Sequence, residues 1–381
     1  MQILSLPQDA IKIINSLHKA GFEAYAVGGC VRDLLMNSPC GDIDITTSAL
    51  PEQTKSLFSD YTVVETGIKH GTVTVVINSI PYEITTFRTE FGYTDSRHPD
   101  SVAFVRDLKQ DLARRDFTIN AIAYSQNSGV VDCFGGIKDL ENKIIRTVGN
   151  PAERYKEDAL RILRALRFAS VLDFKIEQDT KNAIFSHADK LTLVSPERIY
   201  TELKKLLLGK NAQRVIEEYK QVLSTVINLD GTTARLSRLP QNHGMRFACV
   251  CGSSVSISLT RLRADNETKR KAQLYAESTP IPLEEIEMKL FISNYGIDDA
   301  RDIAAYRRAI FNEDETHEIE KIIASKTPLF LSDLAINGKD LQAIGVSGKA
   351  IGENLKALLC SVIKSEIPND REALLKKAKE I

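Results

Sequence analysis

Residues 25–33 read Tyr25-Ala26-Val27-Gly28-Gly29-Cys30-Val31-Arg32-Asp33, and they place two glycines between an apolar run and a helix-like segment. We expect a strand over residues 22–27, a tight turn at Gly28-Gly29 and a helix that continues through Met36. Glycine lets backbone N–H groups approach phosphates closely, and a helix N-terminus favours their negative charge. Arg32 lies one turn into this helix, where it can add a charge-assisted bond to a phosphate oxygen. A plain tight turn is the commoner meaning of such a glycine pair, so its significance depends on the motifs around it.

Two aspartates follow the turn in the segment Asp42-Ile43-Asp44-Ile45. We expect a strand here, in which side chains two residues apart point to the same face. Two close carboxylates are costly unless a cation lies between them, and hard oxygen ligands suit Mg²⁺ or Mn²⁺. Two such ions can activate an attacking hydroxyl group and neutralise a leaving pyrophosphate. An isolated pair is usually a solvated strand edge, but after the glycine turn we predict that Asp42 and Asp44 are catalytic and bind Mg²⁺. Glu83 could add a third carboxylate or could face solvent.

A third motif combines two arginines, an aspartate and an asparagine within seven residues, in Asp111-Leu112-Ala113-Arg114-Arg115-Asp116-Phe117-Thr118-Ile119-Asn120-Ala121. Either Arg114 or Arg115 can take phosphate oxygens in a fork, because guanidinium donors match that geometry. Asp116 and Asn120 can bond ribose hydroxyl groups, which would favour ribonucleotides. A salt-bridged helix start is the alternative interpretation of the same residues.

Residues 157–169 have the periodicity of one amphipathic helix. At about 100° per residue, the apolar positions share one face, expected to be the core face: Ala159, Ile162, Leu163, Leu166 and Ala169. Arg161 and Arg164 are expected on the opposite side, with Asp158 one turn before Arg161. A carboxylate accepts from the exocyclic amino group of cytosine or adenine and repels the carbonyl oxygen of uracil or guanine. A helix with ion pairs between residues three apart is the alternative.

The fold class follows from a change of pattern near residue 150. The first 150 residues mix expected helices with short β-rich runs at 61–65, 72–77 and 82–87, bounded by Gly, Asn and Pro as hairpins require. Such hairpins argue against a Rossmann domain, which alternates strands with long helices. From about Pro151 a period of 3.6 residues dominates, so we predict an α+β protein with a helical remainder. Candidate breaks fall near Gly209, over residues 231–258 and at residues 279–282.

Taken in order, these motifs resemble the tRNA nucleotidyltransferase and bacterial poly(A) polymerase family, the class II branch of the DNA polymerase beta-like superfamily. The match is close over about the first 170 residues. It continues more loosely in three later segments, Ser195-Pro196-Glu197-Arg198-Ile199, Leu262-Arg263-Ala264-Asp265-Asn266-Glu267 and Ile336-Asn337-Gly338-Lys339-Asp340-Leu341.

The resemblance implies four parts. They are a nucleotidyltransferase head with a small mixed sheet over residues 1–150, followed by an all-helical neck (151–209), body (210–278) and tail (279–381). The helical parts are expected to hold the acceptor arm and elbow of tRNA.

The resemblance also implies roles for matching residues. Asp158 and Arg161 match the amino-acid template that pairs with CTP and then with ATP. Gly29 and Arg32 are assigned to the triphosphate, and Arg164 and Arg167 are added to the nucleotide site. The reaction so implied is addition of C, C and A to the 3′ end of tRNA, with release of pyrophosphate.

Family members differ in their product, and the alternatives within the family are an A-adding enzyme and a poly(A) polymerase. Members restricted to CC addition lack a flexible segment between the Asp-x-Asp and Arg-Arg-Asp motifs, whereas residues 88–100 supply one here. Bacterial poly(A) polymerases usually carry strongly basic extensions, and this tail is net acidic. Complete CCA addition is therefore expected. A non-catalytic RNA-binding protein on the same scaffold is a remote alternative, against which the intact motif residues argue.

Charge is distributed unevenly along the chain, although the formal net charge is −1. Residues 1–150 carry 14 Lys and Arg against 18 Asp and Glu, residues 151–275 carry 22 against 14, and residues 276–381 carry 14 against 19. A basic middle between two acidic ends indicates a polyanion along the centre. Basic helices with a solvated face are the alternative.

Length and composition indicate a soluble, multidomain protein. At 381 residues the chain predicts two to four domains, and 43% hydrophobic with 27% charged residues is typical of globular proteins. No stretch approaches the roughly 20 apolar residues of a membrane span, and the N-terminal residues lack the basic region of a signal peptide. We expect a cytoplasmic monomer or homodimer without membrane contact, whose six cysteines are reduced rather than zinc-bound.

Overall fold

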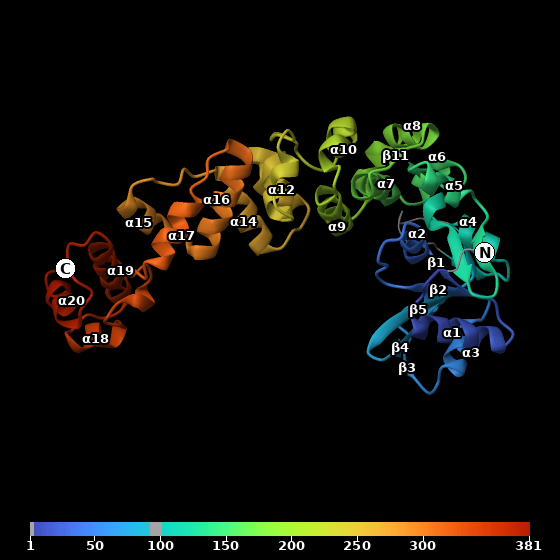
Figure 1. The fold of residues 1–381 in the computed structure, drawn as a ribbon, viewed down its shortest axis with the longest axis horizontal. Coiled ribbons are helices and arrows are strands. Elements are labelled where there is room, and N and C mark those ends of the chain that lie inside the picture. The colour runs from blue at the N-terminus through green and yellow to red at the C-terminus, as the bar shows by residue number, and fades with distance from the viewer. Residues whose placement is uncertain (1–3, 92–100) are drawn as a thin grey trace. The chain divides into compact units, whose positions relative to one another are not determined.

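The computed structural model describes residues 4–91 and 101–381, and the chain divides into two compact units, Met1–Ile227 and Asn228–Ile381 (Figure 1). The expected body, residues 210–278, extends across this division. The expected boundaries of the four domains therefore stay predictions.

The first unit is built on a seven-stranded sheet in the order β3-β4-β5-β2-β1-β8-β9. Its neighbours pair antiparallel except β2 and β5, which are parallel, so the expected mixed sheet is confirmed. The strands are β1 (Ala24–Val27), β2 (Asp44–Thr47), β3 (Thr62–Val64), β4 (Thr72–Ile77), β5 (Ile80–Thr86), β8 (Ile122–Ser125) and β9 (Gly129–Asp132).

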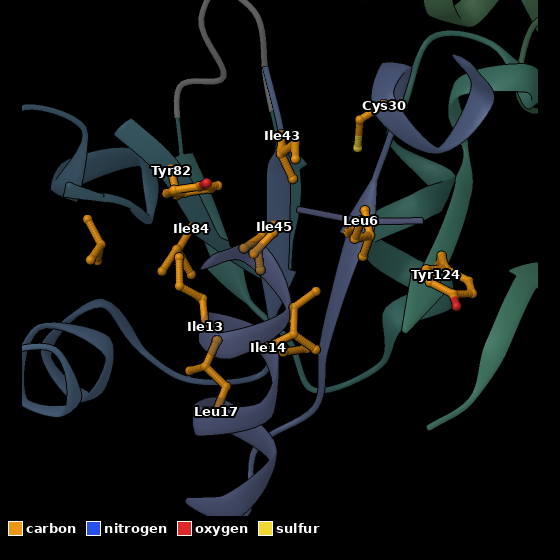
Figure 2. Close-up of a cluster of buried hydrophobic side chains, with 14 of the residues drawn as sticks. Leu6, Ile13, Ile14, Leu17, Cys30, Ile43, Ile45, Tyr82, Ile84 and Tyr124 are labelled. Carbon is orange, nitrogen blue, oxygen red and sulfur yellow. The ribbon is translucent and has the colours of Figure 1, made fainter. Parts of the chain in front are cut away.

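Helices cover both faces of this sheet, because alternate residues of each strand point to opposite sides. On one face, helix α1 (Gln8–Lys19) packs Ile13 and Leu17 near Ile45 and Ile84 of the central strands, as Figure 2 shows. Full burial of each such side chain contributes roughly 2 kcal/mol. The other face packs against helix α4 (Leu108–Ala113), which buries leucines at both ends. The helix α3 (Pro51–Leu57) lies beside α1 (Figure 1).

The rest of the first unit is mostly helical. Its helices are α2 (Gly29–Leu35), α5 (Gly136–Glu141), α6 (Pro151–Glu157), α7 (Leu160–Leu172), α8 (Gln178–Ser186), α9 (Pro196–Leu207), α10 (Ala212–Glu218) and α11 (Lys220–Leu223). One short strand departs from the all-helical expectation after residue 150. This strand, β11 (Lys175–Ile176), pairs in parallel with β10 (Ile144–Ile145), because the Lys175 N–H donates to the carbonyl of Lys143 at 2.9 Å.

The single helix expected over residues 157–169 is wrong at its start. α6 ends at Glu157, Asp158 is extended (φ −143°, ψ 103°), and α7 begins at Leu160. The Oδ1 atom of Asp158 accepts the Leu160 N–H at 3.0 Å, and such side-chain acceptors favour a helix start over a helix interior. The predicted core face of the helix is buried at every position.

The second unit contains nine helices among the residues that the structure describes: α12 (His243–Cys251), α13 (Val255–Arg261), α14 (Asn266–Glu277), α15 (Glu285–Tyr295), α16 (Ile297–Phe311), α17 (Thr316–Ala324), α18 (Gly338–Ala343), α19 (Lys349–Ile363) and α20 (Arg371–Ala378). One apolar core joins α15, α16 and α17, and another joins α18, α19 and α20. No helix in the described part of the chain is long and apolar enough to cross a membrane.

The candidate break near residues 231–258 is confirmed only at its start, since the two units divide between Ile227 and Asn228 and α12 begins at His243. Residues 279–282 do connect two helices. The first segment carries α12, which is buried from Gly244 to Cys251. Gly231 allows the backbone of this segment to pack closely against α12, since a Cβ atom on Gly231 would lie 2.1 Å from the carbonyl oxygen of Cys249.

A separate two-stranded sheet lies in the chain between β5 and β8 of the main sheet. Its strand β6 (Arg88–Phe91) pairs antiparallel with β7 (Ser101–Phe104). Of the flexible segment expected over residues 88–100, residues 92–100 lie outside the described residues.

Candidate active site

Sheet register brings the two predicted metal ligands to the glycine turn. Asp44 pairs with Val27, the last residue of β1 before Gly28, and on its other side with Glu83 of β5. The strand begins at Asp44, so Asp42 lies just before the strand and not within it as expected. Asp42 and Asp44 are both exposed, and Ile43 between them is buried in the core (Figure 2), so the two carboxylates share a side.

The turn at Gly28 requires glycine for two reasons. Its φ of +82° lies in the left-handed region, and a Cβ atom there would lie 3.1 Å from Nη1 of Arg115 and 3.8 Å from Oδ2 of Asp44. The backbone N–H of Gly28 donates to the carbonyl of Ile122 at 3.3 Å, which fixes the turn to β8. The structure thus gathers the glycine turn, the carboxylate of Asp44 and the second arginine of the Arg-Arg-Asp motif.

Charge at this edge favours a cation. Although Asp44 is exposed, partial desolvation by the surrounding protein raises its pKa; the positive charge of Arg115 opposes this shift, and the carboxylate of Asp42 adds to it. Burial also raises the pKa of Glu83, and both aspartates add to that rise. Within residues 4–91 and 101–381, no group of three or more His, Cys, Asp or Glu side chains is placed to hold a metal. The candidate metal ligands are therefore the carboxylates of Asp42 and Asp44. Two carboxylates fit Mg²⁺, which usually keeps water and substrate phosphates as its other ligands.

Arg114 and Arg115 differ in their surroundings. The Nε of Arg114 donates to Asp111 at 3.0 Å, its Nη1 donates to Glu90 at 3.0 Å, and its carbonyl accepts from Arg161 at 3.2 Å. Arg114 is thereby built into the scaffold, and Arg115 is the one that lies beside Gly28 and Asp44.

Asp111 is a contributor that the sequence analysis did not single out. It is fully buried and accepts from Thr46 of β2 at 3.0 Å and from the backbone N–H of Arg88 at 3.2 Å. Its position three residues before Arg114, the spacing of a helical ion pair, was the available signal. Asp111 therefore ties the strand of the metal ligands to the arginine motif.

Asp116 and Asn120 lie in one buried hydrogen-bond network with two predicted nucleotide ligands. Asp116 accepts from Nε of Arg164 at 2.8 Å and from Asn120 at 3.1 Å, and Asn120 accepts from Nη1 of Arg32 at 2.7 Å. Burial acts to raise the pKa of Asp116, but Arg164 and Asn120 outweigh it and hold that pKa at about 2. Asp116 is therefore ionised near neutral pH, and its proposed bond to a ribose would be made within this network.

Asp158 and Arg161 do not pair with each other. Oδ2 of Asp158 accepts from Arg198 of α9 at 2.7 Å, and Nη1 of Arg161 donates to Glu157 at 2.7 Å. The expectation that Arg161 lies on a face opposite the core is wrong, because Arg161 is only 8% exposed and its Nη2 donates to the carbonyl of Arg114 at 3.2 Å. Arg198 was quoted only within a loosely matching segment, and no local pattern pointed to its contact with Asp158.

The remaining predicted nucleotide-binding residues, Gly29 and Arg167, lie on α2 and α7. Gly29 is the first residue of α2, and a Cβ atom there would lie 3.5 Å from Nη2 of Arg32. Arg167 forms an ion pair with Glu202 of α9, with Nε and Oε2 2.9 Å apart. Whether these residues bind a nucleotide stays a prediction.

Three family models match the chain. A poly A polymerase head domain matches residues 24–146, an RNA and SrmB-binding site of polymerase A matches residues 173–222, and a tRNA nucleotidyltransferase domain 2 matches residues 256–378.

The chain is also similar to full-length proteins. A CCA-adding enzyme of Ligilactobacillus salivarius is 39% identical, with 98% of this chain and 96% of that relative covered. The crystal structure of the Bacillus stearothermophilus CCA-adding enzyme in complex with CTP is similar with a TM-score of 0.84 and 34% identity, over 98% of this chain and 96% of that one. A Thermotoga maritima CCA-adding enzyme complexed with tRNA_CCA shares the fold, with a TM-score of 0.69 and 22% identity over 100% and 99% of the two chains.

Proposed function

The chain belongs to the family of CCA-adding enzymes, which are tRNA nucleotidyltransferases, and from this premise we propose how its own residues carry out the reaction. It adds C, C and A to the 3′ end of tRNA from CTP and ATP without a nucleic-acid template. The 3′-hydroxyl attacks the α-phosphate, and pyrophosphate leaves in line. The observation that carries the proposal is the meeting of Asp44, Gly28 and Arg115 at one edge of the sheet.

Enzymes of this family are metal-dependent, and we assign Asp42 and Asp44 as ligands of Mg²⁺. When bound, such ions activate the attacking hydroxyl group and neutralise charge on the leaving pyrophosphate. The carboxylate of Asp42, which adds to the raised pKa of Asp44, supports this assignment. Glu83 faces Asp44 across the strand pair and serves as an outer carboxylate of the same edge.

The phosphates are assigned to the turn and to four arginines. The backbone N–H of Gly29 lies at the start of α2, where an anion is favoured, whereas the N–H of Gly28 is bonded to Ile122. Arg32, Arg115, Arg164 and Arg167 supply the guanidinium donors, which match phosphate oxygens in a fork. Asp116 and Asn120 bond the ribose. Arg114 belongs to this motif and acts by holding its backbone in place, as its bonds to Asp111 and Glu90 indicate.

One pair of side chains can select both C and A. Cytosine and adenine each present an amino donor beside a ring-nitrogen acceptor, whereas uracil and guanine present a carbonyl acceptor beside an N–H donor. Asp158 accepts one bond at each oxygen and keeps further lone pairs for an amino group. Arg161 uses two donors on Glu157 and Arg114, and a guanidinium has five. The pair therefore fits CTP and ATP and disfavours UTP and GTP.

The tRNA partner is assigned to the basic middle of the chain. Residues 151–275 carry an excess of eight positive charges, from 22 Lys and Arg against 14 Asp and Glu, and phosphate contacts dominate nucleic-acid affinity. We propose that the neck (151–209), body (210–278) and tail (279–381) hold the acceptor arm and elbow of tRNA. The enzyme acts in the cytoplasm, as a monomer or homodimer.

The decisive experiment supplies two tRNA transcripts, one that ends at its discriminator base and one that already carries CC. CTP, ATP or both are added with Mg²⁺, and the 3′ ends are sequenced. Addition of CC with CTP alone, and of CCA with both nucleotides and no further residue, is the expected result. A run of A residues would instead identify a poly(A) polymerase, addition to tRNA-CC only would identify an A-adding enzyme, and no incorporation would leave an RNA-binding protein.

A further inference from the structure

The ring of Phe168 lies where arginines from two helices meet. Phe168 belongs to α7, directly after Arg167, and is 7% exposed. Its ring packs edge-on against Phe117, with the centroids 5.7 Å apart and the planes at 81°. Because Phe117 follows Asp116 in the Arg-Arg-Asp motif, the ring is fixed by a segment that also reaches the nucleotide site.

Three guanidinium groups surround this ring. The distance from Cζ to the ring centroid is 4.2 Å for Arg167, 5.1 Å for Arg32 and 5.6 Å for Arg164. Arg32 comes from α2, and the other two come from α7. All three distances lie within the roughly 6 Å over which a ring face attracts a cation.

Three positive charges this close together oppose one another. Burial lowers the pKa of Arg167, the carboxylate of Glu202 opposes that shift, and the charges of Arg164 and Arg32 lower it further. Each arginine also has a carboxylate partner that offsets part of the repulsion: Asp33 with Arg32 at 2.8 Å, Asp116 with Arg164 at 2.6 Å and Glu202 with Arg167 at 2.9 Å.

Unlike those carboxylates, the ring leaves the N–H donors of the arginines available. Its negative face attracts a guanidinium through the quadrupole of the π-system, and it occupies none of the N–H donors that a phosphate oxygen requires. An aromatic ring can therefore hold several arginines together and keep their edges available to an anion. A further carboxylate would consume those donors.

We propose that Phe168 is a positioning residue that holds Arg32, Arg164 and Arg167 as one preformed site for the triphosphate of the incoming nucleotide. The inference rests on the proposed assignment of these arginines to the nucleotide. A residue that only filled the core would be replaced well by leucine, which has similar apolar character and no π-face. The aromatic character of position 168, and not its volume alone, sets triphosphate affinity.

The test compares triphosphate and monophosphate binding in Phe168→Leu and Phe168→Tyr of the full chain. Phe168→Leu raises the dissociation constants of CTP and ATP about tenfold, the loss expected for one or two desolvated cation–π contacts. The dissociation constant of CMP changes less than about twofold, because a monophosphate engages fewer guanidinium groups. Phe168→Tyr keeps the ring and restores CTP affinity to within about twofold of wild type. The preference for CTP over UTP is unchanged in both, since Asp158 and Arg161 read the base.

A matched control removes a different buried phenyl ring. Phe174, just after α7, is 2% exposed and has none of these arginines on its ring. Phe174→Leu lowers the melting temperature to a similar extent as Phe168→Leu and leaves CTP affinity at the wild-type value. If Phe168→Leu fails to fold, Phe168→Met is judged by the same comparison of CTP with CMP.

Three results would overturn the inference: wild-type CTP affinity in the non-aromatic variant, equal loss of CTP and CMP binding, or failure of tyrosine to restore CTP binding. Arg32→Gln and Arg167→Gln separate this outcome from failure of the proposed function. If both arginine variants bind CTP as wild type does, the assignment of the arginines fails and the inference fails with it. If they weaken CTP binding and Phe168→Leu does not, the arginine assignment stands and only the role of the ring is rejected.

Discussion

The edge that carries Asp42 and Asp44 and the region that carries Asp158 and Arg161 are both highly charged, but they are organised in opposite ways. At the metal edge like charges face each other, and partial desolvation together with Asp42 raises the pKa of Asp44. In the region around Asp158 and Arg161, the proposed selecting region, each of three carboxylates forms an ion pair with an arginine: Asp158 with Arg198 at 2.7 Å, Asp116 with Arg164 at 2.6 Å and Glu157 with Arg161 at 2.7 Å.

The two regions therefore differ in what must bind before each can act. The carboxylates of Asp42 and Asp44 share one side of the strand, so the proposed metal ion would offset their charges, and turnover is expected to depend on that ion. In the selecting region these ion pairs fix the side chains before a nucleotide binds. Such preorganisation reduces the free-energy cost of recognising a base. Variants of the metal edge should therefore abolish turnover, whereas variants of the selecting region should change which nucleotide is used.

The largest effect is expected from Asp44→Asn. Loss of a metal ligand removes several kcal/mol of charge stabilisation, so incorporation of labelled CTP and ATP should fall about a thousandfold or more. The affinity for tRNA, measured by filter binding, should stay at the wild-type value. Asp60→Asn, at an exposed position of the same unit, serves as the matched control and should retain activity. Retained turnover in Asp44→Asn would contradict the metal assignment.

A smaller effect, on selectivity and not on turnover as such, is expected from Asp158→Ala. The ratio of kcat/KM for CTP to that for UTP should fall about 10- to 100-fold, the value of one base-edge contact. Because Asp158 also accepts the Leu160 N–H, Asp158→Asn provides the control. Asparagine keeps an acceptor for that bond but offers an amide donor to the base, so it should shift use towards UTP. An unchanged CTP-to-UTP ratio in Asp158→Ala would remove Asp158 from the selecting role.

Arg198→Gln should reduce the same ratio by about three- to tenfold, because Arg198 acts on the base only through its charge-assisted bond to Asp158. Steady-state kinetics with CTP and UTP measure this change. Arg214→Gln is the control, since Arg214 pairs with Glu218 at 3.6 Å on a different helix. If Arg198→Gln left selectivity intact, Asp158 would be positioned by its backbone alone.

The smallest effect is a shift in pH dependence. The charge of Arg115 lowers the pKa of Asp44, so Arg115→Gln should raise that pKa further. A carboxylate binds a metal only when ionised, so Mn²⁺ binding followed by electron paramagnetic resonance should begin at a higher pH in this variant. Lys138→Gln, an exposed substitution elsewhere in the unit, should leave the pH profile unchanged. An unchanged pH profile in Arg115→Gln would show that Arg115 does not act on Asp44.

The sequence could predict features that local spacing determines. The glycine turn, the Asp-x-Asp pair, the β-rich runs and the buried face of α7 all follow from residue periods of two or 3.6. The family resemblance then supplied the product and the nucleotide-selecting roles of Asp158 and Arg161. These local features were enough to bring Asp44 to the glycine turn.

Contacts between distant segments could not be predicted in this way. Arg198 meets Asp158 across 40 positions only because α9 packs against α7, and nothing near either residue indicates that pairing. The extended backbone at Asp158 was missed because helical periodicity continues through residues 157–169, although an aspartate before a helix was an available signal. In the same way, Arg161 was expected on an open face because a helical wheel shows one helix without its neighbours.

Asp111 joins three segments that are separate in sequence: β2 through Thr46, the base of the β6–β7 hairpin through the Arg88 N–H, and the arginine motif through Arg114. The amide proton of Arg88 is therefore bonded to a fully buried carboxylate and can exchange with solvent only when this junction opens. Its rate of hydrogen–deuterium exchange reports directly on how often the catalytic edge comes apart in the absence of any substrate.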